Sequence, residues 1–176
     1  GCRVMTPVLR FRPSDIQWWA SRYDYGINET QVTALIPEVR QKQCLTKRQL
    51  RTIAAWKAPR SAGYMERNTA RYVREVTSIA LSAASERLRI ETLTLLDGVS
   101  WPTASVILHF FHRSRYPIID YRALWSVKLK TPSQYDFPFW WSYVKYCRVL
   151  AGRNHVDMRT LDRALWQYSK ERQPSL

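Results

Sequence analysis

One carboxylate, Asp120, follows a segment in which an apolar helix, a tight turn and a new helix succeed each other. The turn contains Gly98 and the new helix begins near Pro102, within the run LLDGVSWPTA. A glycine turn lets the backbone approach a phosphate without an intervening side chain. The start of the following helix presents N–H groups and the positive end of the helix dipole. This order of groups is typical of a DNA-binding hairpin with a catalytic acid behind it.

The composition favours a polyanionic partner. Lys and Arg number 28 against 14 Asp and Glu, which gives a net charge of +14. Each phosphate that a Lys or Arg neutralises releases condensed counterions, so such a chain suits nucleic acid. An anionic membrane surface would instead favour one basic amphipathic helix, whereas these basic residues are spread along the chain. We therefore expect a nucleic-acid partner and no membrane partner.

Cysteine usage points to a reducing compartment. Cys2, Cys44 and Cys147 are odd in number and far apart, without a CxxC motif. This pattern disfavours a disulfide framework and a zinc or iron–sulfur site. No apolar run approaches membrane-spanning length, and no apolar signal-peptide core is present. We expect an intracellular protein, in the cytoplasm and nucleoid of a prokaryote or the nucleus of a eukaryote.

Hydrophobic periodicity predicts an all-α fold in a single domain of residues 1–176, because no strand alternation of useful length occurs. The expected helices cover about 14–24, 29–42, 46–57, 66–82, 86–96, 102–112, 120–130, 137–151 and a final segment capped by Asp157. The hairpin motif occupies about 86–112. On the helix from Glu66, the expected apolar face contains Val73, Val76, Ile79, Ala80 and Ala83.

The pattern Leu96-x-Gly98-Val99-x-x-x-Thr103-Ala104, with Asp120 downstream, resembles the helix-hairpin-helix DNA glycosylase superfamily, which includes endonuclease III-type and adenine-mismatch glycosylases. The resemblance covers about residues 64–130. The interval from Pro102, at the family's variable Lys/Ser position, to Asp120 (120 − 102 = 18) fits the family spacing. The run Pro117-Ile118-Ile119-Asp120 also resembles the apolar approach to the family's catalytic Asp.

The resemblance implies a compact glycosylase-like helical domain and a monofunctional enzyme, because Pro102 stands where bifunctional members carry a Schiff-base lysine. Lyase chemistry through that residue is excluded. Asp120 would stabilise an oxocarbenium-like transition state and orient or activate water. No cofactor is implied, apart from a structural Na⁺ or K⁺ bound by hairpin carbonyls at Thr94, Leu96 and Val99. Two departures are Ser100, in place of a second hairpin glycine, and the absence of a four-cysteine iron–sulfur motif.

Several side chains are candidate DNA ligands. The hairpin supplies Gly98, Ser100, Trp101 and Thr103. Basic residues suited to the phosphate backbone are Arg67, Arg71 and Arg74, spaced as a helical stripe, and the loop residues Lys57, Arg60, Arg113 and Arg115. A solvated helix surface is the alternative for the stripe, and solvated side chains are the alternative for the loop residues.

A flipped base also needs aromatic stacking partners. The candidates for a base pocket are Trp18, Trp19, Tyr23, Trp140 and Trp141, with Tyr25 and Tyr143 as further aromatic residues. Most of these aromatic side chains must nevertheless belong to the core. His109 and His112 lack an acidic third partner, which disfavours a metal site.

Two main hypotheses follow, and an RNA-binding role is a distant third, since the hairpin favours DNA-type backbone geometry. The first is a monomeric, monofunctional DNA N-glycosylase acting on double-stranded DNA, in base excision repair or in defence against modified phage DNA. The second is a non-catalytic helix-hairpin-helix DNA-binding module in a larger complex, which the departures at Ser100 and Pro102 favour. The alternative to a catalytic role for Asp120 is the N-cap of the helix that begins at Tyr121, and the two roles can coexist.

Overall fold

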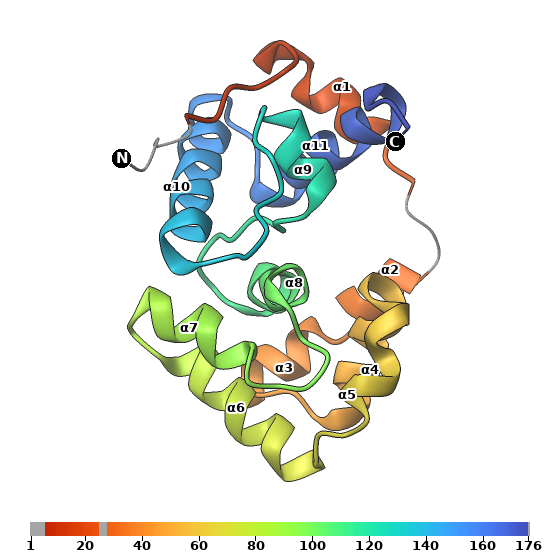
Figure 1. Ribbon diagram of the computed structural model, residues 1–176, viewed down its shortest axis with the longest axis vertical. Coiled ribbons are helices and arrows are strands. Elements are labelled where there is room, and N and C mark those ends of the chain that lie inside the picture. Colours follow the sequence, from red (N-terminus) through yellow and green to blue (C-terminus); the bar gives the residue numbers. More distant parts are fainter. Residues whose placement is uncertain (1–5, 25–27, 176) are drawn as a thin grey trace. The chain divides into compact units, whose positions relative to one another are not determined.

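The computed structural model describes residues 6–24 and 28–175, so Cys2 and Tyr25 lie outside the described residues. The described residues form helices and contain no strand. The chain divides into two compact units, residues 25–116 and residues 1–24 with 117–176. Figure 1 shows the helices of both units. The all-α prediction is therefore confirmed, and whether the two units fold as one domain stays a prediction.

The central unit, residues 25–116, contains seven α-helices in its described part. They are α2 (Asn28–Thr33), α3 (Ile36–Lys42), α4 (Lys47–Lys57), α5 (Ala62–Met65), α6 (Ala70–Ser82), α7 (Glu86–Leu93) and α8 (Trp101–Phe111), with the 3-10 helix η2 (Pro59–Ser61) before α5. Helix α8 packs against α3, α4 and α7. Its residues from Thr103 to Leu108 are all buried, so α8 is the core helix of this unit.

The other unit joins the N-terminal segment to the C-terminal helices. It contains the 3-10 helix η1 (Pro13–Asp15), followed by α1 (Ile16–Ser21), α9 (Tyr121–Ser126), α10 (Phe137–Arg153) and α11 (Met158–Arg172). Helix α11 packs against α1, α9 and α10. The N–H groups of Val8 and Arg10 donate to the carbonyls of Val127 and Ser126, both at 2.9 Å. These bonds satisfy carbonyls that the end of α9 leaves without helical partners.

Three expected boundaries are wrong. The helix expected over 29–42 is interrupted at Ala34–Leu35, because Pro37 lies in the first turn of α3 and cannot donate a helical hydrogen bond. The helix expected from Glu66 begins at Ala70, where Thr69 caps it. The helix expected over 120–130 ends at Ser126, and Lys128 adopts a left-handed φ of 58°.

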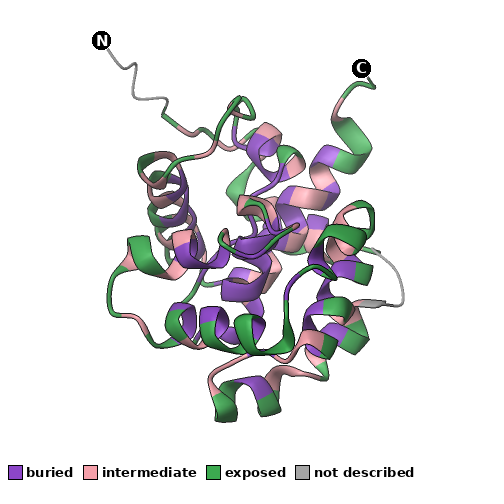
Figure 2. Cartoon of the chain, turned by 60° about the horizontal axis from the view of Figure 1, so that its bottom comes forward, coloured by how far each residue is buried: buried purple, intermediate pink, exposed green. Residues whose placement is uncertain are grey.

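Burial follows one face of most helices, as Figure 2 shows by colour. On α6, Val73, Val76 and Ala80 are buried, as expected from the periodicity. Ile79 is 51% exposed, so its assignment to the buried face is wrong. No helix in the described part of the chain is both long and apolar enough to cross a membrane.

Candidate functional site

Helix α8 begins without a side-chain cap. Among the described helices of eight or more residues, α4, α6, α7, α10 and α11 each have a side-chain cap, whereas Ser100 makes no such bond to α8. Trp101 and Pro102 form the first two residues of α8, so Pro102 is the second helical residue rather than the first. Backbone N–H groups at such a helix start are suited to bind an anion.

The turn before α8 requires glycine at position 98. Gly98 has a φ of +79°, in the left-handed region that side chains disfavour. A Cβ atom there would lie 2.7 Å from Met65 Cγ, 2.9 Å from Met65 N and 2.9 Å from Ser61 O. The turn therefore packs directly on the backbone of the η2–α5 segment.

Asn68, which follows α5 in the sequence, also fixes this turn. Its side-chain Oδ1 accepts the Asp97 N–H at 2.9 Å, and its Nδ2 donates to the Asp97 carbonyl at 3.0 Å. The same Nδ2 donates to the Met65 carbonyl at 2.9 Å. Asn68 is only 3% exposed, so these bonds are shielded from water. The amide thus joins the turn to α5.

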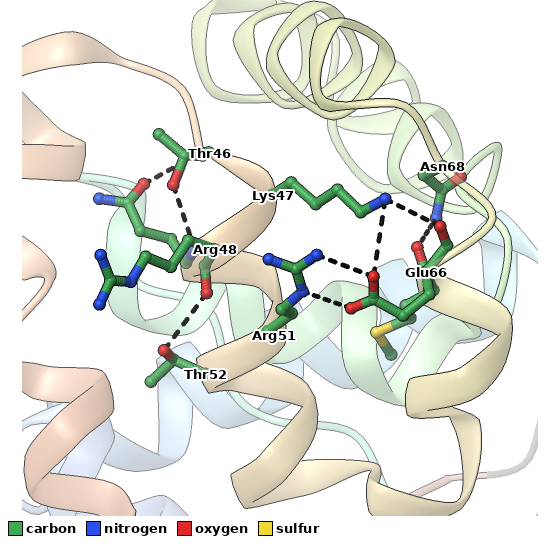
Figure 3. Close-up of polar contacts among 9 residues, drawn as sticks. Thr46, Lys47, Arg48, Arg51, Thr52, Glu66 and Asn68 are labelled. Carbon is green, nitrogen blue, oxygen red and sulfur yellow. Dashed lines mark hydrogen bonds and ion pairs between the residues drawn. The ribbon is translucent and has the colours of Figure 1, made fainter.

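Helix α4 holds the segment that carries Asn68, as Figure 3 shows. Lys47 Nζ donates to the Glu66 carbonyl at 2.8 Å. Arg51 makes two hydrogen bonds to the Glu66 carboxylate, through Nε and through Nη2. No local motif predicts this cluster, because Lys47 and Arg51 belong to α4 whereas Glu66 follows α5, 15 positions after Arg51.

Two of the expected DNA ligands flank the turn. Arg60 precedes Ser61, whose carbonyl contacts Gly98, and Arg67 precedes Asn68. Both arginines are exposed. Arg67 precedes α6, so the helical stripe of Arg67, Arg71 and Arg74 is wrong as one continuous row.

The remaining expected ligands have different surroundings. Arg71 pairs with Glu75 at 3.0 Å on the exposed face of α6. Thr103 is 3% exposed, so its side chain belongs to the core and only its backbone N–H faces the helix start. Trp101 and Lys57 are half-buried.

The loop after α8 presents Arg113 and Arg115 from a fixed backbone. His112 Nδ1 accepts the Ser114 N–H at 2.9 Å, and His109 Nδ1 lies 2.6 Å from the Tyr116 carbonyl. Both histidines therefore interact with the backbone through Nδ1. Both arginines are exposed.

Tyr116 ties the end of this loop to α7. Its hydroxyl donates to Glu86 and accepts from Arg89 Nη1, the latter at 2.7 Å. Burial, and next the hydrogen bond to Glu86, raise the pKa of Tyr116 above its ordinary value. A neutral phenol is therefore retained in this network.

Asp120 lies in the unit formed by the N- and C-terminal segments. It is 8% exposed and caps α9, because its Oδ1 accepts the Ala123 N–H at 2.8 Å. The capping role considered from the sequence is therefore confirmed, and a cap can also serve catalysis. The Gly98 turn belongs to the other unit. The link between this turn and Asp120 is therefore their interval in the sequence.

Two tyrosines are electrostatically coupled to Asp120. Burial, and next the negative charge of Asp120, raise the pKa of Tyr135 to about 12. Burial also raises the pKa of Tyr143 well above its ordinary value, with smaller contributions from Cys147, Asp162 and Asp120. Tyr135 was not among the expected pocket residues, because it lies in a loop without a periodic pattern.

A second buried carboxylate positions the segment that leads to Asp120. Asp162 is 5% exposed, and its Oδ1 accepts the Ile118 N–H at 2.8 Å. Its Oδ2 pairs with Arg159 Nη1 at 3.0 Å. Arg159 Nη2 in turn donates to the Tyr23 hydroxyl at 3.1 Å. This network connects Tyr23, an expected pocket residue, to the backbone two residues before Asp120.

The other expected pocket residues are placed differently. Trp140 is fully buried and lies beside Phe137 and Trp141. Trp19 is 5% exposed and packs edge-on against Tyr168. Both are core residues in this structure, whereas Trp18 is 52% exposed.

The expected monovalent-cation site would use neutral backbone oxygens. The Leu96 carbonyl already accepts the Val99 N–H at 3.1 Å, which uses one of its two lone pairs. Carbonyls of Thr94, Leu96 and Val99 are a donor set suited to Na⁺ or K⁺, and the cation stays a prediction. Within residues 6–24 and 28–175, no cluster of three or more His, Cys, Asp or Glu could hold a metal ion.

Comparisons with protein-family models, curated proteins and solved structures found no match. The assignment of function therefore depends on the residues of this chain.

Proposed function

We propose that this chain is a monofunctional DNA glycosylase that hydrolyses the N-glycosidic bond of a flipped base in double-stranded DNA. The observation that carries the proposal is the uncapped start of α8 after the Gly98 turn, with Asp120 at an interval of 18 residues from Pro102 (120 − 102). This combination supports a glycosylase because the helix-hairpin-helix glycosylases, which the chain resembles, have a hairpin and a catalytic Asp at this spacing. Base excision repair and defence against modified phage DNA are the two roles that this activity would serve.

The turn and the start of α8 would bind a phosphate. The backbone N–H of Thr103 and the helix dipole favour an anion at this position. Arg60 and Arg67 are exposed and adjoin Ser61 and Asn68, which contact the turn, so both add positive charge to this region. Such contacts position a duplex without reading its sequence.

Asp120 would act on the flipped nucleotide. Its carboxylate would stabilise positive charge that develops on the sugar and would orient the attacking water. Water forms the new bond to C1′, the bond from C1′ to the base breaks, and the base leaves with the bonding pair. One water proton is released and the other remains in the new hydroxyl group of the abasic site. Pro102 offers no amine, so no Schiff base forms there.

The test is incubation with duplexes that each contain one alkylated, oxidised, deaminated, mismatched or bulky modified base. Released base and an alkali-labile abasic site are expected with at least one of them. The second candidate function, a non-catalytic DNA-binding module, is favoured by Ser100 and Pro102. It predicts salt-sensitive duplex binding without base release from any substrate.

A further inference from the structure

Several aromatic and cationic side chains lie close together on the unit that carries Asp120. We call the following set the aromatic–cationic surface: Trp18 and Arg22 near α1, Tyr121 and Arg122 of α9, and Trp166 and Lys170 of α11. Helix α11 packs against both α1 and α9, so it connects the members of this set.

Each cation of this surface lies over an aromatic ring. Arg22 Cζ is 4.9 Å from the ring centroid of Trp18, and Arg122 Cζ is 5.1 Å from that of Tyr121. Trp166 lies between two cations, with Arg122 Cζ at 5.5 Å and Lys170 Nζ at 5.2 Å from its centroid. Arg122 therefore lies close to both Trp166 and the exposed ring of Tyr121, and Lys170 adds a second positive charge beside Trp166.

The two outer rings are unusually open to solvent. Trp18 is 52% exposed and Tyr121 is 55% exposed. Glu171 is the acidic partner of Arg22, at 2.7 Å, and the surface retains a positive balance through Arg122 and Lys170. Large aromatic rings left in water beside excess positive charge favour a partner that offers flat apolar faces together with anionic groups.

We propose that the aromatic–cationic surface binds single-stranded nucleic acid. Bases would stack on Trp18 and Tyr121, while Arg22, Arg122 and Lys170 would contact the phosphates. A single strand is required because the base faces of a duplex are already stacked on one another. The proposal goes beyond the duplex contact assigned to the turn and does not depend on base release.

Fluorescence anisotropy with a labelled oligothymidylate of about 12 nucleotides tests the proposal, since single-strand sites span roughly 4–16 nucleotides. Trp18→Ala and Tyr121→Ala should each weaken binding by about 5- to 100-fold. Trp18→Phe and Tyr121→Phe should retain most of the affinity, because phenylalanine also stacks. Lys170→Gln should lower the salt dependence by about 0.7 in the slope of log K against log[salt].

Tyr72→Ala is the matched control, because Tyr72 is a partly exposed aromatic residue of α6 in the other unit, 39% exposed. It should leave oligonucleotide binding unchanged. Unaltered binding by both Trp18→Ala and Tyr121→Ala, with circular dichroism like that of the wild type, would overturn the proposal. So would binding of this surface to anionic phospholipid vesicles in preference to the oligonucleotide. The assay measures binding alone, so it can support this proposal even if the protein has no glycosylase activity.

Discussion

Asn68 hydrogen-bonds the backbone of Asp97 through both ends of its side-chain amide, at 2.9 and 3.0 Å. This pair fixes the turn that precedes α8 to the end of α5, and Asn68 is nearly fully buried. A residue that is separated from the turn by 29 positions (97 − 68) thus determines its geometry.

Asn68→Ala should lower the free energy of unfolding by about 2–4 kcal/mol, because it leaves buried backbone groups without partners. Urea unfolding measures the loss. Asn154→Ala is the control, since the Asn154 amide bonds a carbonyl of its own helix at 2.8 Å and is half-buried. Equal losses in the two variants would contradict the role given to Asn68.

Gly98→Ala should destabilise the protein by about 2–4 kcal/mol, from left-handed strain and from overpacking on Met65 and Ser61. Gly63→Ala provides the comparison, because a Cβ atom at Gly63 meets no atom within 4 Å. Gly63 lies inside α5, so alanine there should stabilise by up to about 1 kcal/mol. Denaturant unfolding of both variants checks the difference, and a neutral Gly98→Ala would refute the packing argument.

Cys147 should resist alkylation in the folded protein. Burial raises the pKa of its thiol well above the ordinary value, so little thiolate forms at mildly alkaline pH. Cys44 is half-buried and serves as the internal comparison. Iodoacetamide should modify Cys147 at least about 100-fold more slowly than Cys44, because each pKa unit changes the thiolate fraction tenfold. Peptide mass spectrometry gives both rates, and similar rates would contradict the burial of Cys147.

Glu171 should stabilise the folded protein at neutral pH, and this stabilisation should be lost in acid. The hydrogen bond from Arg22, and next that from Gln167, lower its pKa to about 2. Since the folded pKa lies below the unfolded value, the contribution is present above about pH 4 and is lost as pH falls toward 2. The thermal midpoint of Glu171→Gln should be slightly below that of the wild type at neutral pH, and the two should converge in acid. A difference that grows with falling pH would have the wrong sign.

Local signals predicted most helices but few tertiary contacts. Thr46 and Gln49 form the capping box that their spacing predicts, and Asp157 caps α11 as expected. Pro37 by itself indicates the interruption before α3, whereas the expected helix over 29–42 was continuous. Asp162 and Asn68 have no local motif, because their partners Ile118 and Asp97 are distant in the sequence.

The sequence predicted that Asp120 caps a helix, but it did not predict which aromatic side chains lie near Asp120. The periodicity of α10 did not identify Trp140 and Tyr143 as fully buried residues. Tyr135 gave no signal, since its environment arises from the packing of a loop. Burial of an aromatic residue therefore required the tertiary structure.

The most direct test of the proposed function compares two aspartates that cap helices in the same way. Asp120 accepts the Ala123 N–H at 2.8 Å and Asp157 accepts the Thr160 N–H at 2.7 Å. Asparagine is also a good N-cap, so Asp120→Asn and Asp157→Asn should both fold. On a duplex from which the wild type releases a base, Asp120→Asn should be slower by at least about 100-fold and Asp157→Asn should be unchanged. Base release by Asp120→Asn at the wild-type rate would contradict the catalytic role of Asp120.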